Sequence, residues 1–290
     1  RHGIGHGRRY CQLGGPMREP LTFACQGAML AATLDRADGA VGLLIVSGGN
    51  EVRCGAHRGM ALLAAALAAA GHPVLRFDRR GIGDSEGDNG GYLSSRDDIA
   101  AAIAAFRAAC PGMTRVVAFG NCDAAAALAL HQPLDVDALL LANPWTIADA
   151  GTGDADPAAA PQLPPASAIR ARYLARLRDP ASLIRLVRGE VDLRKLVGGL
   201  ARLVRPAPPA APDSLGQRLC AAIRAAPQPV TLVLATRDRT AQAFGDHWDR
   251  SGGDGQVTCW RLDSASHSFA GSDADWLCDK LLGALRDGRD

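Results

Sequence analysis

Lysine and aromatic residues are scarce in this chain of 290 residues. Lys195 and Lys280 are the only lysines, and aromatic residues make up 4% of the sequence. No apolar run approaches the ~18 residues needed to cross a membrane, and no short apolar run follows a basic head as in a secretory signal. The formal net charge is only +2, which argues against nucleic acid as a partner. We therefore expect a cytoplasmic protein.

Closely spaced cysteine pairs are also missing. The eight cysteines are scattered along the chain, whereas disulfide scaffolds are short and cysteine-dense, and zinc sites need clustered ligands. We expect reduced thiols that mostly pack as small apolar side chains, with no metal and no cofactor. His2 and His6 are isolated candidates for metal ligands, and we expect no metal there.

Apolar residues make up 48% of the sequence, enough for a sizeable core. Short apolar runs alternate with alanine-rich runs of helical character, which predicts a mostly parallel sheet of about eight strands with helices on both faces. The expected strands are residues 21–25, 28–34, 41–47, 73–77, 115–119, 136–142, 230–235 and 256–262, and the expected helices are 56–70, 94–109, 123–131, 241–250 and 272–285.

Two segments interrupt this alternation. Residues 1–16 have no apolar period and do not start with Met; we expect vector-encoded residues or a misassigned start, with the native chain beginning at Met17. Residues 146–213 lie between two strands and contain two Pro-rich stretches, which predicts a helical cap inserted at the rim of the sheet. The core then comprises residues 17–145 and 214–290.

One strand-to-helix junction carries a nucleophile-type residue between small ones. The run Gly120-Asn121-Cys122-Asp123-Ala124 matches the nucleophile elbow G-x-S-x-G, with Cys in place of Ser and Ala in place of the second Gly. A nucleophile on such a tight turn needs small neighbours, because the strand and the helix nearly touch. The helix N-terminus favours a thiolate and later an oxyanion. The alternative is a buried cysteine in an ordinary turn.

The strand over residues 41–47 ends in Ser47-Gly48-Gly49-Asn50. In the elbow architecture, the loop after this strand supplies one backbone N–H to the oxyanion hole, and the residue after the nucleophile supplies another. These donors would be Gly49 or Asn50, together with Asp123. The glycine-rich turn over residues 77–85 matches D-x-R-G-x-G-x-S, and we expect it to position other groups without reacting itself.

A carboxylate and a histidine follow later strands in the order that this architecture requires. Asp238 comes just after the strand over residues 230–235, and His267 lies in the loop after the last strand. The chain order nucleophile, acid, histidine predicts a triad of Cys122, Asp238 and His267. Asp263 is a rival acid, although its place at a strand end suggests a turn residue.

These motifs resemble the α/β-hydrolases. The runs Gly49-Asn50-Glu51, Ala56-His57-Arg58-Gly59 and Gly120-Asn121-Cys122-Asp123 narrow the resemblance to the exosortase A system-associated hydrolase 1 family, which covers about residues 20–285. Many relatives have His-Gly where this chain has Ser47-Gly48. The resemblance implies a bacterial hydrolase found alongside exopolysaccharide and protein-sorting systems.

A Cys-His-Asp triad predicts hydrolysis of an ester or thioester through a thioester acyl-enzyme. Two alternatives remain: acyl transfer to a sugar or carrier, and a non-catalytic scaffold with a degraded triad. The substrate would be a small acyl ester or thioester. We expect Trp145 to contact this substrate. We also expect Arg53, His57 and Arg58 to bind a carboxylate or phosphate group of the substrate.

The expected cap is strongly basic. Residues 170–205 contain ten basic and three acidic residues among many leucines. Such an amphipathic segment could cover an anionic or carrier-linked acyl group, or rest on an anionic membrane surface. A solvated arginine face is the alternative.

Overall fold

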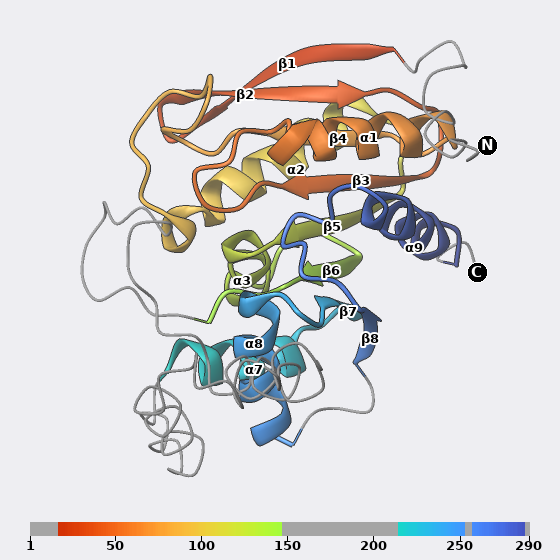
Figure 1. Cartoon of the computed structure of the whole chain (residues 1–290). Coiled ribbons are helices and arrows are strands. Elements are labelled where there is room, and N and C mark those ends of the chain that lie inside the picture. The colour runs from red at the N-terminus through yellow and green to blue at the C-terminus, as the bar shows by residue number, and fades with distance from the viewer. Residues whose placement is uncertain (1–16, 147–213, 253–256, 288–290) are drawn as a thin grey trace, which may run out of the picture.

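The computed structural model describes residues 17–146, 214–252 and 257–287. Eight strands form one sheet in the order β1-β2-β4-β3-β5-β6-β7-β8 (Figure 1). Neighbouring strands from β4 across to β8 are parallel, whereas β2 is antiparallel to both β1 and β4. The expected α/β-hydrolase fold with a mostly parallel sheet is confirmed. The helical cap expected over residues 146–213 lies, beyond its first residue, outside the described residues.

The strands are β1 (Arg18–Cys25), β2 (Ala28–Asp35), β3 (Val41–Val46), β4 (Val74–Phe77), β5 (Arg115–Asn121), β6 (Ala138–Ala142), β7 (Val230–Ala235) and β8 (Thr258–Leu262). The helices are α1 (Gly59–Ala69), α2 (Arg96–Ala109), α3 (Asp123–Leu130), α7 (Leu215–Ala225), α8 (Arg239–Arg250) and α9 (Asp273–Asp287), with short 3-10 turns at Ala56–Arg58 and Tyr92–Ser94.

Most expected elements agree with these bounds to within a few residues. The expected helix over residues 56–70 is the main difference. Its first residues lie outside the α-helix because His57 and Arg58 have positive φ angles of 52° and 61°, which a right-handed helix does not allow. Helix α7 is an addition to the expected set. It begins where Ser214 Oγ accepts the Gln217 N–H at 3.3 Å, a normal N-cap.

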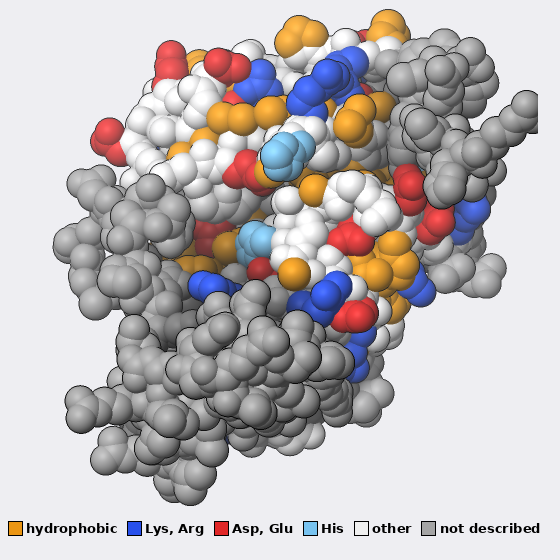
Figure 2. All heavy atoms as spheres, in the orientation of Figure 1, with side chains coloured by type: hydrophobic (Ala, Val, Ile, Leu, Met, Phe, Trp, Pro, Cys, Tyr) orange, Lys and Arg blue, Asp and Glu red, His pale blue; other side chains and the backbone are white. Residues whose placement is uncertain are grey.

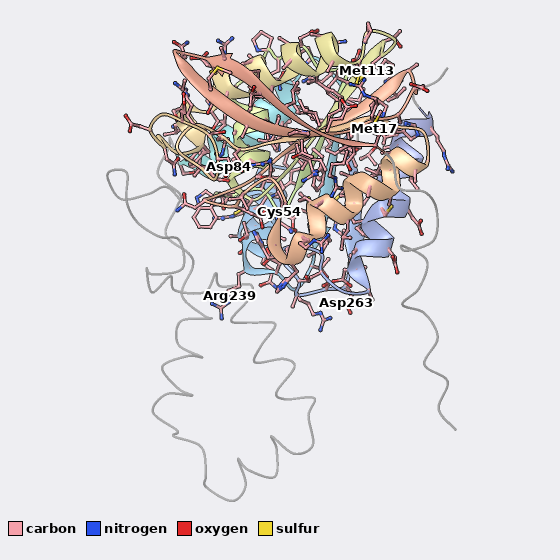
Figure 3. The ribbon with its side chains drawn as sticks, turned by 90° about the horizontal axis from the view of Figure 1, so that it is seen from above. Met17, Cys54, Asp84, Met113, Arg239 and Asp263 are labelled. Carbon is pink, nitrogen blue, oxygen red and sulfur yellow. The ribbon has the colours of Figure 1, made fainter. Side chains whose placement is uncertain are left out.

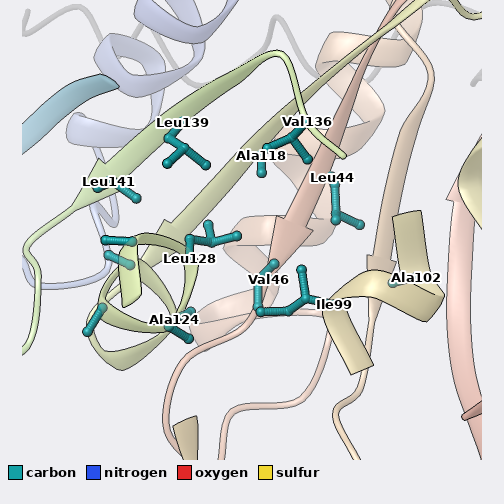
Figure 4. Packing of buried hydrophobic residues seen from close by; sticks show 14 of the residues in the cluster. Leu44, Val46, Ile99, Ala102, Ala118, Ala124, Leu128, Val136, Leu139 and Leu141 are labelled. Atoms are coloured by element: carbon teal, nitrogen blue, oxygen red, sulfur yellow. The ribbon is translucent and has the colours of Figure 1, made fainter. Parts of the chain in front are cut away.

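The sheet is buried on both faces. On one face, α1 and α9 cover Leu43, Ile45 and Val117 from β3 and β5. On the other face, α2, α3, α7 and α8 cover Leu44 and further buried side chains of the same strands. Figure 4 shows this second cluster, in which side chains of β3, β5 and β6 meet those of α2 and α3. Strands buried on both faces explain the continuous apolar runs.

Because β3 and β5 to β8 are parallel, their carboxyl ends share one edge of the sheet. The loops that carry the candidate active-site residues all leave this edge, as ligand sites do in open α/β sheets. Across the described ranges, no helix is both long enough and apolar enough to cross a membrane.

Candidate active site

Cys122 occupies a strained turn between β5 and α3. Its backbone has φ 62° and ψ −126°, a conformation that is costly for a residue other than glycine. Backbone hydrogen bonds hold it there: the Cys122 N–H donates to the Ala142 carbonyl at 3.0 Å, and its own carbonyl accepts the N–H of Trp145 at 3.1 Å. The strain is therefore compensated by contacts from β6 and the segment that follows it.

Close packing around the turn explains the small residues on either side of it. A Cβ atom on Gly120 would lie 2.8 Å from the Ala124 carbonyl carbon and 2.9 Å from its oxygen. Ala124 itself is completely buried. The turn thus requires Gly120 and accommodates alanine at position 124, where the elbow pattern has its second glycine.

His267 approaches the turn from the loop after β8. Its Nδ1 lies 3.0 Å from Asp238 Oδ2, and the Cys122 thiol is near enough to help raise the pKa of His267. The same Asp238 oxygen accepts the N–H of Ala241 at 3.0 Å, because Asp238 is the N-cap of α8. The rival acid Asp263 lies elsewhere, highly exposed and paired with Arg237 at 2.9 Å.

Electrostatics favour the charged forms of His267 and Asp238. Burial lowers the pKa of His267, but hydrogen bonds and charge interactions with Asp238 and Cys122 outweigh it and raise that pKa to about 10. Burial raises the pKa of Asp238, yet the hydrogen bond with His267 and backbone N–H donors leave it below its usual value. Both shifts favour an imidazolium at His267 paired with a carboxylate at Asp238.

Two asparagines, of which Asn143 is completely buried, hold the His267 loop, and sequence reasoning missed the role of both. Asn121 Nδ2 and Asn143 Nδ2 donate to the His267 carbonyl at 3.0 and 3.1 Å. Asn143 also donates to Asn121 Oδ1 at 3.2 Å and accepts the N–H of Ala235 at 2.9 Å. The sequence does offer one signal for the role of Asn143, because it places an amide side chain directly after a central strand.

The loop expected to supply the oxyanion hole lies against the elbow. A Cβ on Gly48 would be 2.5 Å from the Asn121 carbonyl oxygen and 3.3 Å from Cys122 Cβ, so only glycine allows this approach. The Gly49 N–H, however, donates to Asp123 Oδ1 at 2.5 Å. One of the expected donors is therefore occupied by a side chain, and the Asn50 amide oxygen accepts a hydrogen bond from Asn89 at 2.9 Å.

The expected substrate contacts Arg53, His57 and Arg58 follow the oxyanion-hole loop, and Arg53 is already paired with carboxylates. Arg53 pairs with Asp78 and, at 2.8 Å, with Asp84. Arg53 and Arg58 line a cavity of about 420 Å³, together with Cys54 and Asp84, which are labelled in Figure 3, and no triad residue lines it. His57 is exposed and does not line that cavity.

Trp145, which we expect to contact the substrate, is largely buried. Its side chain is only 9% exposed and belongs to the hydrophobic cluster under α3. Its backbone N–H donates to the Cys122 carbonyl. The contacts of Trp145 therefore support the elbow.

Glu51 is an acidic neighbour of the site that sequence reasoning did not select. Burial raises the pKa of its carboxyl, although a hydrogen bond from the Ala56 N–H at 2.6 Å and the charge of His267 oppose this effect. The nearby Asp123 charge raises it further. On the face shown in Figure 2, acidic, basic and histidine side chains occur close together.

The glycine-rich turn after β4 is tied into the fold as expected. Asp78 is completely buried and accepts the N–H of Asp84 at 3.1 Å. Ser85 Oγ donates to the Asp78 carbonyl at 2.7 Å. Arg80 pairs with Asp98.

Over the part of the chain that the structure describes, no three His, Cys, Asp or Glu residues are grouped so that they could hold a metal ion.

The sheet order and the elbow are those of the α/β-hydrolases, and the model of the alpha/beta hydrolase family matches residues 25–280. The chain belongs to the alpha/beta hydrolase family. No curated protein sequence matches this hydrolase.

Solved structures share its fold at low sequence identity. An esterase from Pyrococcus furiosus is 15% identical, with a TM-score of 0.58 over 93% of this chain and 91% of the esterase. The thioesterase domain from the curacin biosynthetic pathway is 14% identical, with a TM-score of 0.56 over 92% of this chain and 99% of the domain. Proline iminopeptidase from Mycobacterium smegmatis is 15% identical, with a TM-score of 0.54 over 93% and 98%. These likenesses establish the fold.

Proposed function

We propose that this hydrolase cleaves a small acyl ester or thioester, with Cys122 as the nucleophile, His267 as the proton carrier and Asp238 as the carboxylate that orients His267. The observation that supports the proposal is the position of His267, whose Nδ1 lies 3.0 Å from Asp238 Oδ2 and whose pKa is raised in part by Cys122. It begins on a strained strand-to-helix turn, the position from which α/β-hydrolases attack their substrates.

Acylation begins when the proton of the Cys122 thiol is transferred to His267. The Cys122 sulfur attacks the carbonyl carbon, and the carbonyl π electrons move to the oxygen. When the tetrahedral intermediate collapses, the carbon–leaving-group bond breaks and His267 gives its proton to the departing oxygen or sulfur. The products are a Cys122 thioester and a free alcohol or thiol.

Deacylation needs His267 to accept a proton, and acylation itself prepares it. The hydrogen bond and the charge interaction with Cys122 contribute to its raised pKa. Both disappear once the sulfur is acylated, so the pKa of His267 falls. The neutral imidazole then takes a proton from water as the water attacks the thioester. The acid is released, and the thiolate–imidazolium pair is restored.

The narrower parts of the proposal rest on sequence motifs. In line with the Gly-Asn-Cys-Asp elbow, we propose a role alongside an exosortase and exopolysaccharide system. We also propose that the basic residues 170–205 bind an anionic or carrier-linked acyl group, or contact a membrane surface. We also propose a cytoplasmic location. The seven described cysteines are in no disulfide, as is usual in a reducing compartment.

The test is intact-protein mass spectrometry after mixing the enzyme with acetyl and longer acyl thioesters and p-nitrophenyl esters. We expect a transient mass increase equal to one acyl group, mapped to Cys122. Cys122→Ala should remove the adduct and lower turnover by several orders of magnitude. The matched control is Cys54→Ala, because Cys54 is a free, partly exposed thiol outside the triad.

Other outcomes separate the remaining functions. An acyl-enzyme that transfers to an added sugar alcohol faster than to water would indicate an acyltransferase. No adduct and no turnover with any of these acyl donors, despite a folded protein, would support a non-catalytic scaffold and refute the proposal.

A further inference from the structure

Both polar backbone groups of Gly49 are held by side chains. Its N–H donates to Asp123 Oδ1 at 2.5 Å, and its carbonyl accepts a hydrogen bond from Arg79. The same Arg79 nitrogen lies 3.4 Å from Asp123 Oδ2. A single arginine and a single carboxylate thus connect the loop after β3 to the residue that follows the nucleophile.

This arrangement conflicts with acyl chemistry in one respect. A tetrahedral intermediate carries negative charge on the former carbonyl oxygen, and its stabilisation needs free N–H donors. The Asp123 carboxylate occupies the donor of Gly49 and would repel that charge. The N–H of Asp123 itself lies in the first turn of α3, where backbone donors have no partner within the helix. The obstacle is therefore the side chain of Asp123, and its backbone is well placed.

We propose that the Asp123 carboxylate occupies the oxyanion hole in the free enzyme and that the substrate displaces it. When a substrate carbonyl accepts the Gly49 N–H, Arg79 pairs with the displaced carboxylate. Arg79 is thus a positioning residue. The inference rests on the proposed function, since it concerns the oxyanion of the same acylation step. It adds a role for the glycine-rich turn after β4, which holds Arg79.

The surroundings of Arg79 suit this role. Arg79 is 4% exposed and its other terminal nitrogen donates to Ser95 Oγ at 3.0 Å, so its position is fixed from the opposite side. Its separation of 3.4 Å from Asp123 exceeds the ~2.8 Å of a strong charge-assisted hydrogen bond. A rotation of the carboxylate can shorten this contact as the bond with Gly49 breaks. The charge pair then compensates for the lost bond, and the arginine neutralises the carboxylate beside the developing oxyanion.

A double-mutant cycle of Arg79→Gln and Asp123→Asn tests the proposal through two reactions of Cys122. Acylation by p-nitrophenyl acetate, followed as a pre-steady-state burst, forms an oxyanion. Alkylation by iodoacetamide uses the same sulfur and forms none. The ratio of the two rate constants isolates the oxyanion hole from any change in thiol reactivity or folding.

We expect Arg79→Gln to lower this ratio by at least ~10-fold, in the range seen when one oxyanion contact is lost. Asp123→Asn should raise it a few-fold, because a neutral amide holds the Gly49 N–H more weakly than a carboxylate does. In the double variant, Asp123→Asn should restore most of the loss, because the unneutralised carboxylate is gone. Arg79→Lys keeps the charge but has one nitrogen in place of two, so its ratio should lie between those of the wild type and Arg79→Gln.

Arg80→Gln is the matched control. Arg80 is in the same turn, but it pairs with Asp98 and makes no contact with Gly49, so its loss should leave the ratio unchanged. A lower ratio for Asp123→Asn alone, or no rescue in the double variant, would show that the two residues only fasten the loop and would overturn the proposal. If the wild type is alkylated but never acylated, the proposed function fails as well.

Discussion

Asp238 Oδ2 lies 3.0 Å from His267 Nδ1 and also caps helix α8 by accepting the Ala241 N–H at 3.0 Å. One carboxylate oxygen thus orients the candidate general base and stabilises the start of a helix. Asparagine caps helices about as well as aspartate, so the two roles can be separated by substitution.

Asp238→Asn should therefore keep the helix cap but lose most of the activity and the charge interaction with His267, whereas Asp238→Ala should lose all three. The cap alone is worth ~1 kcal/mol, which sets the expected difference in free energy of unfolding between the two variants. Urea unfolding combined with steady-state hydrolysis measures both properties. Equal stability of the two variants would mean that the cap contributes nothing.

The pKa of His267 makes stability depend on pH in the alkaline range. The pKa is raised from the usual value of 6.5 to about 10, so the folded state binds the proton more tightly than the unfolded state does. The resulting stabilisation is fully present below about pH 6.5 and is lost as pH rises towards about 10. Histidine NMR titration should show a lower pKa for His267 in Cys122→Ala, because one of its two partners is removed. An unchanged pKa would contradict the coupling on which the deacylation step depends.

Asn143 should matter for activity although it is not part of the triad. Its amide connects β5, β7 and the His267 loop, and its side chain is completely buried. We expect Asn143→Ala to lower kcat about 10-fold or more and to cost ~1–3 kcal/mol of stability, because the buried His267 carbonyl loses a donor. Gln228→Ala is a suitable control, since its amide pairs with Gln132 at 2.8 Å at the opposite end of β7. Equal effects of the two variants would argue against a positioning role.

Gly120 should not tolerate any side chain. An alanine there would push its Cβ to 2.8 Å from the backbone of Ala124, and backbone cannot yield as a side-chain tip does. We expect Gly120→Ala to cost ~1–3 kcal/mol and to disturb Cys122. Gly112→Ala provides the comparison, because a Cβ at position 112 meets nothing within 4 Å. Thermal unfolding of both variants tests this difference.

Brief treatment with substoichiometric iodoacetamide should label Cys122 before the buried cysteines. Burial raises the pKa of Cys25 to about 11 and raises the pKa values of Cys110, Cys220 and Cys259, so these thiols stay protonated and slow to react. Peptide mapping identifies the labelled site, and His267→Ala should slow the reaction at Cys122. Even labelling of all cysteines would show that no activated thiolate exists.

Much of the fold follows from local sequence patterns. Continuous apolar runs such as Val41–Val46 mark strands that are buried on both faces, and alternation with helical runs requires parallel pairing. The triad candidates also follow from chain order, because the carboxyl ends of parallel strands meet at one edge. Cys122, Asp238 and His267 could be selected without coordinates, since each lies directly after a strand or on a turn of recognisable composition.

Other features depend on contacts between segments far apart in the sequence. No local pattern shows that Asn143 binds the His267 carbonyl, that Arg53 is already paired with Asp78, or that α7 completes the cover of one face. The occupied N–H of Gly49 is the clearest case. A glycine-rich loop and a helix N-terminus each predict free donors, and only the tertiary structure brings the Asp123 carboxylate onto Gly49 and Arg79 beside both. Local conformation is set by neighbours in the chain, whereas the occupancy of a donor is set by whichever group the fold brings within reach.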